Sequence, residues 1–290
     1  MSRRREIARR LDSLSDIAGI MSAMKGLALM EIHLLTDFLA SQQRMVQGVE
    51  ETAAQFLREH PDQASSVVPE RELCVLMGSE QGFCGDFNEA LLERMAAITQ
   101  EKNGTVRWLV VGRKLASRIG ERDDVELALP GAVVADEVPA VLLRLTRELG
   151  RILAGAQVAG YLAGYGLSTL YHSDAIGDIR MQSLLPLRDL PSPAKGSTYP
   201  ADLNLTPEAF LRGLTGHYLY AAFNAVLYSS LMAENRQRQI HMDNALQRLD
   251  EDCARLQLAY NIQRQEEITE EIEVILLSAD MLQQAVAGAA

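Results

Sequence analysis

Residues 239–246 read QIHMDNAL and belong to a C-terminal run that contains no proline after Pro207. Apolar positions advance through this run by steps of three and four, and most residues between them are polar: Met242, Ala245, Leu249, Cys253, Leu256 and Tyr260. That spacing is typical of a helix with one narrow apolar stripe. Such a stripe is too narrow for burial inside a globular core, so the sequence predicts a long helix that lies along one other helix.

The N-terminal region carries a matching stripe. It continues in alternating steps of four and three for about seven heptads. It consists of Ile7, Leu11, Leu14, Ala18, Met21, Lys25, Ala28, Ile32, Leu35, Leu39, Gln42, Val46, Val49, Ala53 and Phe56. The first proline is Pro61. We therefore expect a helix of about 55 residues, near 80 Å long at 1.5 Å per residue.

The second helical run has a clear start at Thr206-Pro207, where threonine suits the N-cap and proline the first helical position. Steps of four and three return near its end, at Ile268, Ile272, Ile275, Ala279, Leu282 and Val286. Since both ends of the chain carry narrow stripes, we expect them to pair as an antiparallel coiled coil. Dimerisation of the two helices with other chains is the alternative.

The residues between the two helical runs have a different hydrophobic pattern, in which short apolar runs alternate with amphipathic segments. Short apolar runs predict strands at Leu73–Gly78, Val106–Val111, Val158–Ala163 and Met181–Leu187. Amphipathic segments predict helices at Asp86–Thr99, Arg113–Ile119 and Val138–Leu153. This alternation indicates a mostly parallel sheet with crossover helices. Because His60–Pro69 and Leu190–Pro207 read as breaks, we expect three parts: residues 1–60, 70–190 and 206–288.

Composition excludes several classes of protein. The net charge of −11 argues against a general nucleic-acid binder, which needs a cationic face. The three cysteines, Cys74, Cys84 and Cys253, fit neither a disulfide framework nor a metal site, so a reducing cytoplasm is expected. No stretch is expected to reach the roughly 20 apolar residues of a membrane span.

Catalytic motifs are absent from the sequence. There is no G-x-x-x-x-G-K-[ST] phosphate-binding loop, and the five histidines show no metal-ligand spacing. Gly82-Phe83-Cys84-Gly85 follows a predicted strand and reads as a tight strand-to-helix turn. A phosphate cradle at the start of a helix is the other reading of that turn. We therefore expect no catalytic residue, no metal and no cofactor.

Four stretches together resemble the gamma subunit of F-type ATP synthases. Residues 20–24 fit the motif I-T-x-A-M with Met21 in place of threonine, and residues 79–88 fit S-D-R-G-L-C-G-G-x-N. S-E-x-x-x-R-x-x-x-M-x-x-A matches at Glu234, Arg238, Met242 and Ala245. R-Q-x-x-I-T-x-E matches at Arg264, Gln265, Ile268, Thr269 and Glu271. The resemblance covers the whole chain in order.

Several positions depart from the family pattern. Gly19 and Ser22 replace basic residues beside the first motif, Gln81 replaces arginine in the turn, and Leu277-Ser278-Ala279 replaces Gly-Gly-Ala. The chain therefore looks like a divergent member. The sodium-coupled N-ATPase branch and another second-copy F-type operon are the placements we consider.

The resemblance implies an antiparallel coiled coil with an inserted Rossmann-like α/β domain, acting as a rotor shaft. The shaft would couple ion flow through a membrane ring to ATP synthesis or hydrolysis in a ring of alpha and beta subunits. The epsilon subunit and the membrane c-ring would be further partners. The complex would be peripheral on the cytoplasmic face of a bacterial inner membrane.

The resemblance also assigns candidate contact residues by position. Arg264, Gln265 and Thr269 would meet the catch loop of a beta subunit, with Gln265 and Thr269 as a hydrogen-bonding pair. Arg238 and Met24 would lie on the shaft, and Arg238 would face an acidic region of beta. A basic collar facing the ring would be formed by Arg3, Arg4, Arg5, Arg9 and Arg10.

Two other functions compete with the rotor shaft. The first is a structural coiled-coil adaptor with an inserted α/β domain, and the second is a small nucleotide-binding enzyme that uses Gly82 and Gly85. An RNA-binding arm or a transit peptide is the competing reading of the arginine-rich first ten residues.

Overall fold

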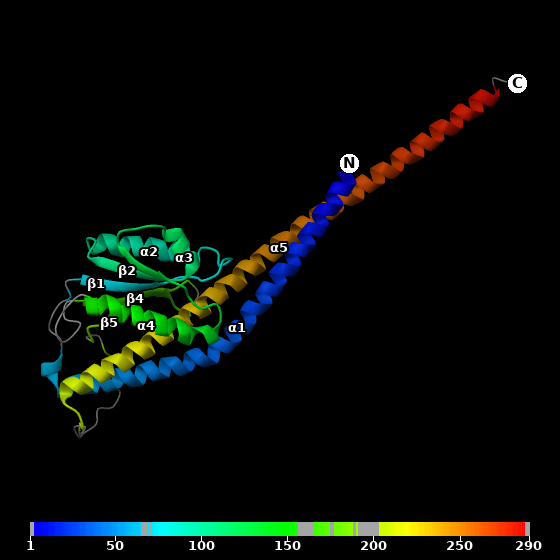
Figure 1. The fold of residues 1–290 in the computed structure, drawn as a ribbon. Helices are drawn as coiled ribbons and strands as arrows, with labels where there is room; N and C mark the ends of the chain where they lie inside the picture. The colour runs from blue at the N-terminus through cyan, green and yellow to red at the C-terminus, as the bar shows by residue number, and fades with distance from the viewer. Residues whose placement is uncertain are drawn as a thin grey trace. The chain divides into compact units, whose positions relative to one another are not determined.

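The computed structural model describes residues 3–64, 69, 71–155, 165–174, 177–187, 190 and 203–287. The chain forms two compact units, one of residues 1–26 with 242–290 and one of residues 27–241. Two helices, α1 (Arg3–Glu59) and α5 (Pro207–Ala287), contribute to both units (Figure 1). The expected fold of long terminal helices with an α/β sheet between them is confirmed. The division at residues 60, 70, 190 and 206 stays a prediction.

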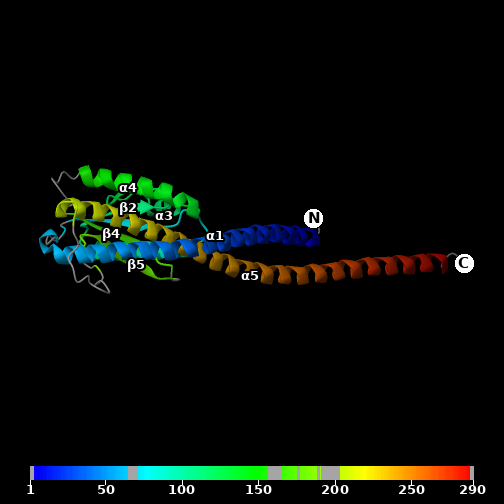
Figure 2. The ribbon, with the colours of Figure 1, turned by 90° about the horizontal axis from the view of Figure 1, so that it is seen from below.

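In the first unit the two helices run antiparallel, side by side (Figure 2). Arg4 Nε lies 3.1 Å from Glu267 Oε2, and Lys25 Nζ lies 2.5 Å from Asp243 Oδ1. As residue numbers increase along α1 from Arg4 to Lys25, the numbers of their partners on α5 decrease from Glu267 to Asp243, so the two helices are antiparallel. The coiled-coil pairing predicted from the two stripes is present in this unit.

Burial follows the predicted stripes. Every α1 stripe position from Ile7 to Phe56 is buried or half-buried, including the polar members Lys25 and Gln42. On α5, Met242 is buried, and Ala245, Leu249, Cys253, Leu256 and Tyr260 are half-buried. Most of the residues between these positions are exposed. The contact between the helices is thus a narrow seam, as the spacing predicts.

The last predicted part of the α5 stripe is wrong where the structure describes it. Ile268, Ile272 and Ile275 are 45%, 52% and 65% exposed. Arg4, next to the first described residue of α1, already faces Glu267, so these positions lie beyond the described part of the seam. The side chains of Ala279, Leu282 and Val286 lie outside the described residues.

The expectation that no stretch is long and apolar enough to span a membrane is also wrong, judged by composition and length alone. An 18-residue window of α1 reaches a mean hydropathy of 1.3, enough by length and composition to cross a membrane. Between Ile17 and Leu35 the only charged residues are Lys25 and Glu31. Both have partners within the chain: Lys25 pairs with Asp243 at the surface, and the buried Glu31 carboxylate accepts the backbone N–H of Ala135. These contacts favour a helix that packs against protein.

The second unit contains a five-stranded sheet in the order β3-β2-β1-β4-β5. Its strands are β1 (Arg71–Met77), β2 (Val106–Val111), β3 (Val125–Leu129), β4 (Tyr165–His172) and β5 (Ile179–Leu185). All neighbouring pairs are parallel except β4 with β5. The connecting helices are α2 (Phe87–Glu101), α3 (Arg113–Ile119) and α4 (Val138–Gly155), with short 3-10 turns η1 (Pro61–Gln63) and η2 (Ala135–Glu137).

Helices cover both faces of this sheet (Figure 1). On one face Cys74 and Leu76 of β1 pack with α2 and α3. On the other face Leu73 and Val75 pack with α4 and with the parts of α1 and α5 that belong to this unit. Because both faces of β1 are buried, its sequence is a continuous apolar run rather than an alternation.

The structure extends the predicted elements at several points. The described strand before β5 is β4, which begins at Tyr165, whereas the predicted strand Val158–Ala163 lies outside the described residues. Strand β3 was not predicted; it is short and only half-buried along alternate positions. The predicted strand Met181–Leu187 corresponds to β5, which begins two residues earlier and is antiparallel to β4.

Two leucines of α5 test the helix seam. Leu249 is half-buried, whereas Leu258 is 63% exposed. We predict that Leu249→Asp lowers the melting temperature of the terminal helices, because an unpaired carboxylate in an apolar contact costs several kcal/mol. Leu258→Asp should leave it unchanged. Circular dichroism at 222 nm with limited proteolysis of the terminal helices measures both. Identical curves for the two variants would show that Leu249 faces solvent.

Candidate functional site

The carboxyl end of β1 is the point from which the candidate site is built. β1 lies between β2 and β4, so the strand order reverses there, and open α/β sheets bind their ligands at such switch points. The chain turns tightly after Met77, with Phe83 and Gly85 at φ 65° and 59°, and enters α2 at Phe87. The turn predicted at residues 82–85 is confirmed.

The turn binds a carboxylate, and that carboxylate comes from α5. The backbone N–H groups of Glu80 and Gln81 each donate to Glu234, at 3.2 Å. Arg238, one helical turn further along α5, pairs with the same carboxylate. Glu234 is only 4% exposed. The amides that a phosphate cradle would offer to a nucleotide are therefore occupied by a side chain of the same protein.

Arg238 lies inside the protein, a different place from the open shaft face expected for it. It is 5% exposed. Besides Glu234, it donates to Gly82 O at 3.3 Å and to Asn235 Oδ1 at 2.8 Å, and its Nη2 lies 3.4 Å from Cys84 Sγ. A guanidinium with its donors used in this way cannot also reach an acidic surface of another subunit.

The environment of Cys84 makes its thiol unreactive. Burial raises the pKa of Cys84 to about 12, and the Glu234 carboxylate adds to this effect. The thiol donates to Gly82 O at 3.3 Å. Burial likewise raises the pKa of Glu234, while Arg238 and the two turn amides oppose that rise. Since the thiolate is the nucleophilic form, Cys84 has a structural role here.

A second carboxylate, Glu80, ties the turn to its neighbours. Its side chain is 1% exposed. Oε2 accepts the backbone N–H groups of Arg113 at 2.9 Å and Gly131 at 2.7 Å, and the Arg113 guanidinium binds Oε1. The turn therefore forms hydrogen bonds with α3 and with the loop after β3, as well as with α5. The sequence analysis missed this role, because Glu80 reads as one polar residue in a turn.

Side chains of the family motif close the turn internally. Asn88 Oδ1 accepts the backbone N–H of Ser79 at 3.0 Å, and Asn88 Nδ2 donates to Ser79 Oγ at 2.8 Å. Gly112 completes the contact at the end of β2: its φ is +115°, and an added Cβ would come within 2.6 Å of Gly78 O. A glycine is therefore required at that position.

Two more α5 residues bond to the same edge of the sheet. Gln237 Nε2 donates to Asp86 Oδ1 at 3.0 Å, and the Arg236 guanidinium binds the backbone carbonyl of Asp174. One turn of α5, residues 234–238, thus contacts the segments that follow β1 and β4. We call this turn, with Glu80 and residues 81–86, the α5 anchor.

His172, beside the α5 anchor, has a structural role. Its ring stacks on Phe87 at 4.0 Å between centroids, and its Nε2 lies 2.8 Å from Phe87 O. Burial lowers the pKa of His172. A neutral ring whose N–H is committed to a backbone carbonyl is held in one orientation.

The residues predicted on the shaft lie on exposed or half-exposed helix surface in the first unit. Arg264, Gln265 and Thr269 are exposed, and Met24 is half-buried. The Thr269 hydroxyl donates to the backbone carbonyl of Gln265 at 2.9 Å. The two residues predicted to pair are therefore linked through the backbone of Gln265 rather than through its side chain. This leaves the Gln265 amide available to a partner.

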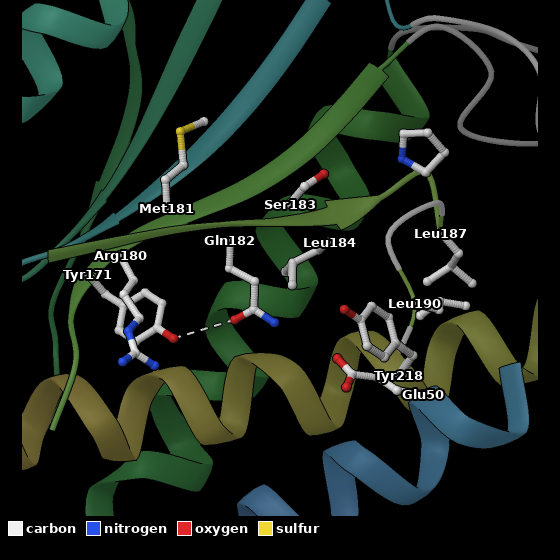
Figure 3. Close-up of a pocket in the computed structure, with 11 residues that line it drawn as sticks. Glu50, Tyr171, Arg180, Met181, Gln182, Ser183, Leu184, Leu187, Leu190 and Tyr218 are labelled. Atoms are coloured by element: carbon white, nitrogen blue, oxygen red, sulfur yellow. Dashed lines mark hydrogen bonds between the residues drawn. The ribbon is translucent and has the colours of Figure 1, made fainter. Parts of the chain in front are cut away.

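A cavity of about 580 Å³ lies elsewhere in the second unit, lined by parts of α1, β4, β5 and α5 (Figure 3). Its polar groups include Glu50, Tyr171, Gln182 and Tyr218. Burial, reinforced by the Glu50 carboxylate, raises the pKa of Tyr218 to about 12. The phenol therefore stays protonated near neutral pH and cannot act as a general base. Among the described residues, no group of three His, Cys, Asp or Glu side chains could hold a metal ion.

Removing Arg238 tests the α5 anchor. We predict that Arg238→Met destabilises the second unit by about 3–5 kcal/mol, because it leaves the buried Glu234 carboxylate without its cation. The exposed Arg248 provides the matched control, Arg248→Met. Chemical denaturation measures the loss, and alkylation of Cys84 at pH 8 reports local opening of the turn. Equal stability and equal labelling in the two variants would show that the pair does not hold the turn.

Comparison with known proteins shows the family of this chain. A family model described as ATP synthase matches residues 3–282. The ATP synthase gamma chain of Clostridium beijerinckii is 24% identical over 93% of this chain and 95% of its own length. That of Moorella thermoacetica is 25% identical over 97% and 100%.

Solved structures show the same fold at low identity. A structure of the OSCP, F1 and c-ring parts of the Euglena gracilis mitochondrial ATP synthase matches with a TM-score of 0.56 and 17% identity, over 96% of this chain and 94% of its own. The central stalk of the Tetrahymena thermophila enzyme matches with a TM-score of 0.54 and 19% identity, over 78% and 99%. With the family model covering nearly the whole chain, this protein belongs to the gamma-subunit family of F-type ATP synthases.

Proposed function

We propose that this chain is the central rotor shaft of an F-type ATP synthase or ATPase. It couples ion flow through a membrane ring to ATP synthesis or hydrolysis in a ring of alpha and beta subunits. The observation that carries the proposal is the narrow antiparallel seam between α1 and α5 in the first unit, together with the family membership. Such a seam joins two helices while leaving most of their surface polar.

A polar outer surface suits a part that turns inside a bearing. A wide apolar face buried against one neighbour would create a deep free-energy minimum at a single angle, since burial contributes roughly 25 cal/mol per Å². Solvated polar contacts are weak and exchangeable. Unequal faces of the shaft would then bias each catalytic subunit toward an open or closed state by differential contacts.

The α5 tip has a different surface, which also suits rotation. Beyond the end of α1, four consecutive apolar residues are exposed, at 60–66% for Val274, Ile275, Leu276 and Leu277. Successive helix positions are about 100° apart, so these side chains surround the helix. Exposed apolar surface of this kind marks a protein contact. Because the hydrophobic effect is non-directional, a helix segment that is apolar on every side has no preferred angle against the protein surface that surrounds it.

Four residues remain candidates for contact with the ring: Met24, Arg264, Gln265 and Thr269. The exposure of Arg264, Gln265 and Thr269 supports this role, and Met24 is half-buried. Arg3, Arg5, Arg9 and Arg10 are exposed and would form the basic collar, while Arg4 pairs with Glu267. Opposite charge on the ring would supply attraction without a locked geometry.

The proposed complex implies further partners for this chain and a location in the cell. We infer contacts with the alpha and beta subunits, the epsilon subunit and the membrane c-ring, with peripheral association at the cytoplasmic face of a bacterial inner membrane. The central-stalk and c-ring context of the structural neighbours and the bacterial origin of the relatives support this. The N-ATPase placement stays a prediction.

The competing functions make different predictions. An adaptor would not be recovered with alpha and beta subunits, whereas a rotor shaft would be. A nucleotide-binding enzyme would use the turn at residues 80–85, but Glu234 already occupies its amides.

Reconstitution tests the proposal directly. We expect the purified chain to show no ATP hydrolysis, because the sequence carries no phosphate-binding loop. Added to alpha and beta subunits, it should assemble with them and restore turnover, as measured by a coupled ATPase assay. Hydrolysis by the chain alone, persisting after contaminating subunits are removed, would contradict the assignment.

The exposed contact face gives a second test. We predict that Gln265→Ala combined with Thr269→Ala changes the stability of the free chain by less than about 0.5 kcal/mol, as surface changes usually do. Turnover of the assembled complex should fall several-fold, since each lost hydrogen bond contributes about 1 kcal/mol net. The control replaces two other exposed α5 residues, Asn244→Ala with Gln247→Ala. Unchanged turnover in the Gln265/Thr269 variant would exclude this face from the contact.

A further inference from the structure

We propose that the α5 anchor is the point at which torque passes between the α/β sheet and the shaft, and that Glu234 is its central positioning residue. The proposal rests on the rotor function above. A rotor needs two contacts: one with the ring that turns it, and one that prevents its own domain from slipping on the helix. The structure shows a cluster of bonds suited to the second task.

The bonds of the anchor are concentrated within one turn of α5. Residues 234, 236, 237 and 238 bond to three separate segments: the amides and carbonyl of residues 80–82, the Asp86 carboxylate and the Asp174 carbonyl. The segments follow β1 and β4, the central strands at which the order of the sheet reverses. A twisting load on α5 is therefore shared between two strands.

Most of the remaining contact between α5 and the sheet is apolar, although the Tyr218 phenol also hydrogen-bonds to Gln182 of β5. The α5 residues in that core include Ala221, Ala222, Phe223, Val226 and Leu227. The hydrophobic effect is itself non-directional, and these contacts hold α5 on the sheet through the fit of packed side chains. Hydrogen bonds to charged groups are directional and roughly twice as strong as neutral ones. Glu234 and Arg238 thus add a strong directional restraint on the angular position of α5.

Glu80 extends the anchor into the domain. The amide of Glu80 binds Glu234, and its own carboxylate binds the amides of Arg113 and Gly131. A force on Glu234 is therefore transmitted through two successive hydrogen bonds from α5 to the start of α3 and to the loop after β3. On α1, the buried Glu31 carboxylate makes a comparable bond to the Ala135 amide at the start of η2. Each long helix is tied to the domain by a carboxylate on backbone amides.

The test uses Glu234→Gln, which keeps the size of the side chain and an oxygen acceptor but removes the charge. The control is Glu251→Gln, an exposed glutamate of the same helix. Each complex is reconstituted into lipid vesicles, and two quantities are measured: ATP hydrolysis, and the membrane potential it generates, followed with a voltage-sensitive dye. The potential reports coupling whichever cation is transported. The melting temperature of each free chain is recorded alongside.

We expect Glu234→Gln to lower the potential generated per ATP hydrolysed several-fold, because the shaft turns in the ring while the domain slips. Glu251→Gln should retain the wild-type ratio. A Glu234→Gln complex with the control's ratio would overturn the proposal. A loss of stability alone would lower hydrolysis and potential together and leave their ratio unchanged, which would also overturn it.

A milder variant decides the case if Glu234→Gln fails to assemble. Gln237→Ala removes only the bond to Asp86, and it should lower the ratio to a smaller extent than the loss of the charge. An unchanged ratio in Gln237→Ala would then contradict the anchor. Failure of the rotor assignment itself has a separate signature: the wild-type chain would restore neither hydrolysis nor potential.

Discussion

The narrow apolar seam between α1 and α5 is the constraint on which the rest of the structure depends. A wider apolar face would draw each helix into a globular core, and a narrower one would not hold two helices together. The ion pairs of Lys25 with Asp243 and Arg4 with Glu267 lie at the two ends of the described seam in the first unit and are consistent with antiparallel pairing. Outside the seam the helix surface is exposed and mainly polar in the first unit, with single apolar side chains such as Ile20 and Leu258 among the polar ones. We propose that this surface makes the changing contacts with a ring of subunits.

The carboxyl end of the sheet illustrates how a fold keeps a site but changes its use. Doubly wound sheets commonly offer amides to a phosphate at this place. Here the amides of Glu80 and Gln81 receive the carboxylate of Glu234 instead, and Arg238 balances its charge. The position at which such sheets bind a ligand is here occupied by a contact between the α/β domain and α5. Long helices otherwise held by apolar contacts need such a contact if they are to carry a twisting load.

Much of this fold could be predicted from the sequence, because heptad spacing and continuous apolar runs are local signals. Strand β4 was missed because Gly166, Ser168 and Thr169 interrupt its apolar pattern, although Thr169 is fully buried. The outward-facing tip of α5 was missed for another reason: its stripe continues past the residue at which the partner helix begins.

The site was less predictable than the fold. Glu234 and Arg238 were visible as motif members, but their burial depends on a turn about 150 residues away in the sequence. Nothing in the local pattern distinguishes a charged residue on an open helix face from one that enters a turn of amides. The local pattern also does not show that the Thr269 hydroxyl donates to a backbone carbonyl of its own helix instead of to the Gln265 side chain.

The central claim is that this chain rotates inside a ring of alpha and beta subunits. The direct measurement is single-molecule observation of the assembled complex, with the ring fixed to a surface and a probe attached to the α/β domain. On addition of ATP, the account predicts stepwise rotation of the probe in one direction at a rate that follows ATP turnover. A probe that stays at a fixed angle while ATP is hydrolysed would contradict it.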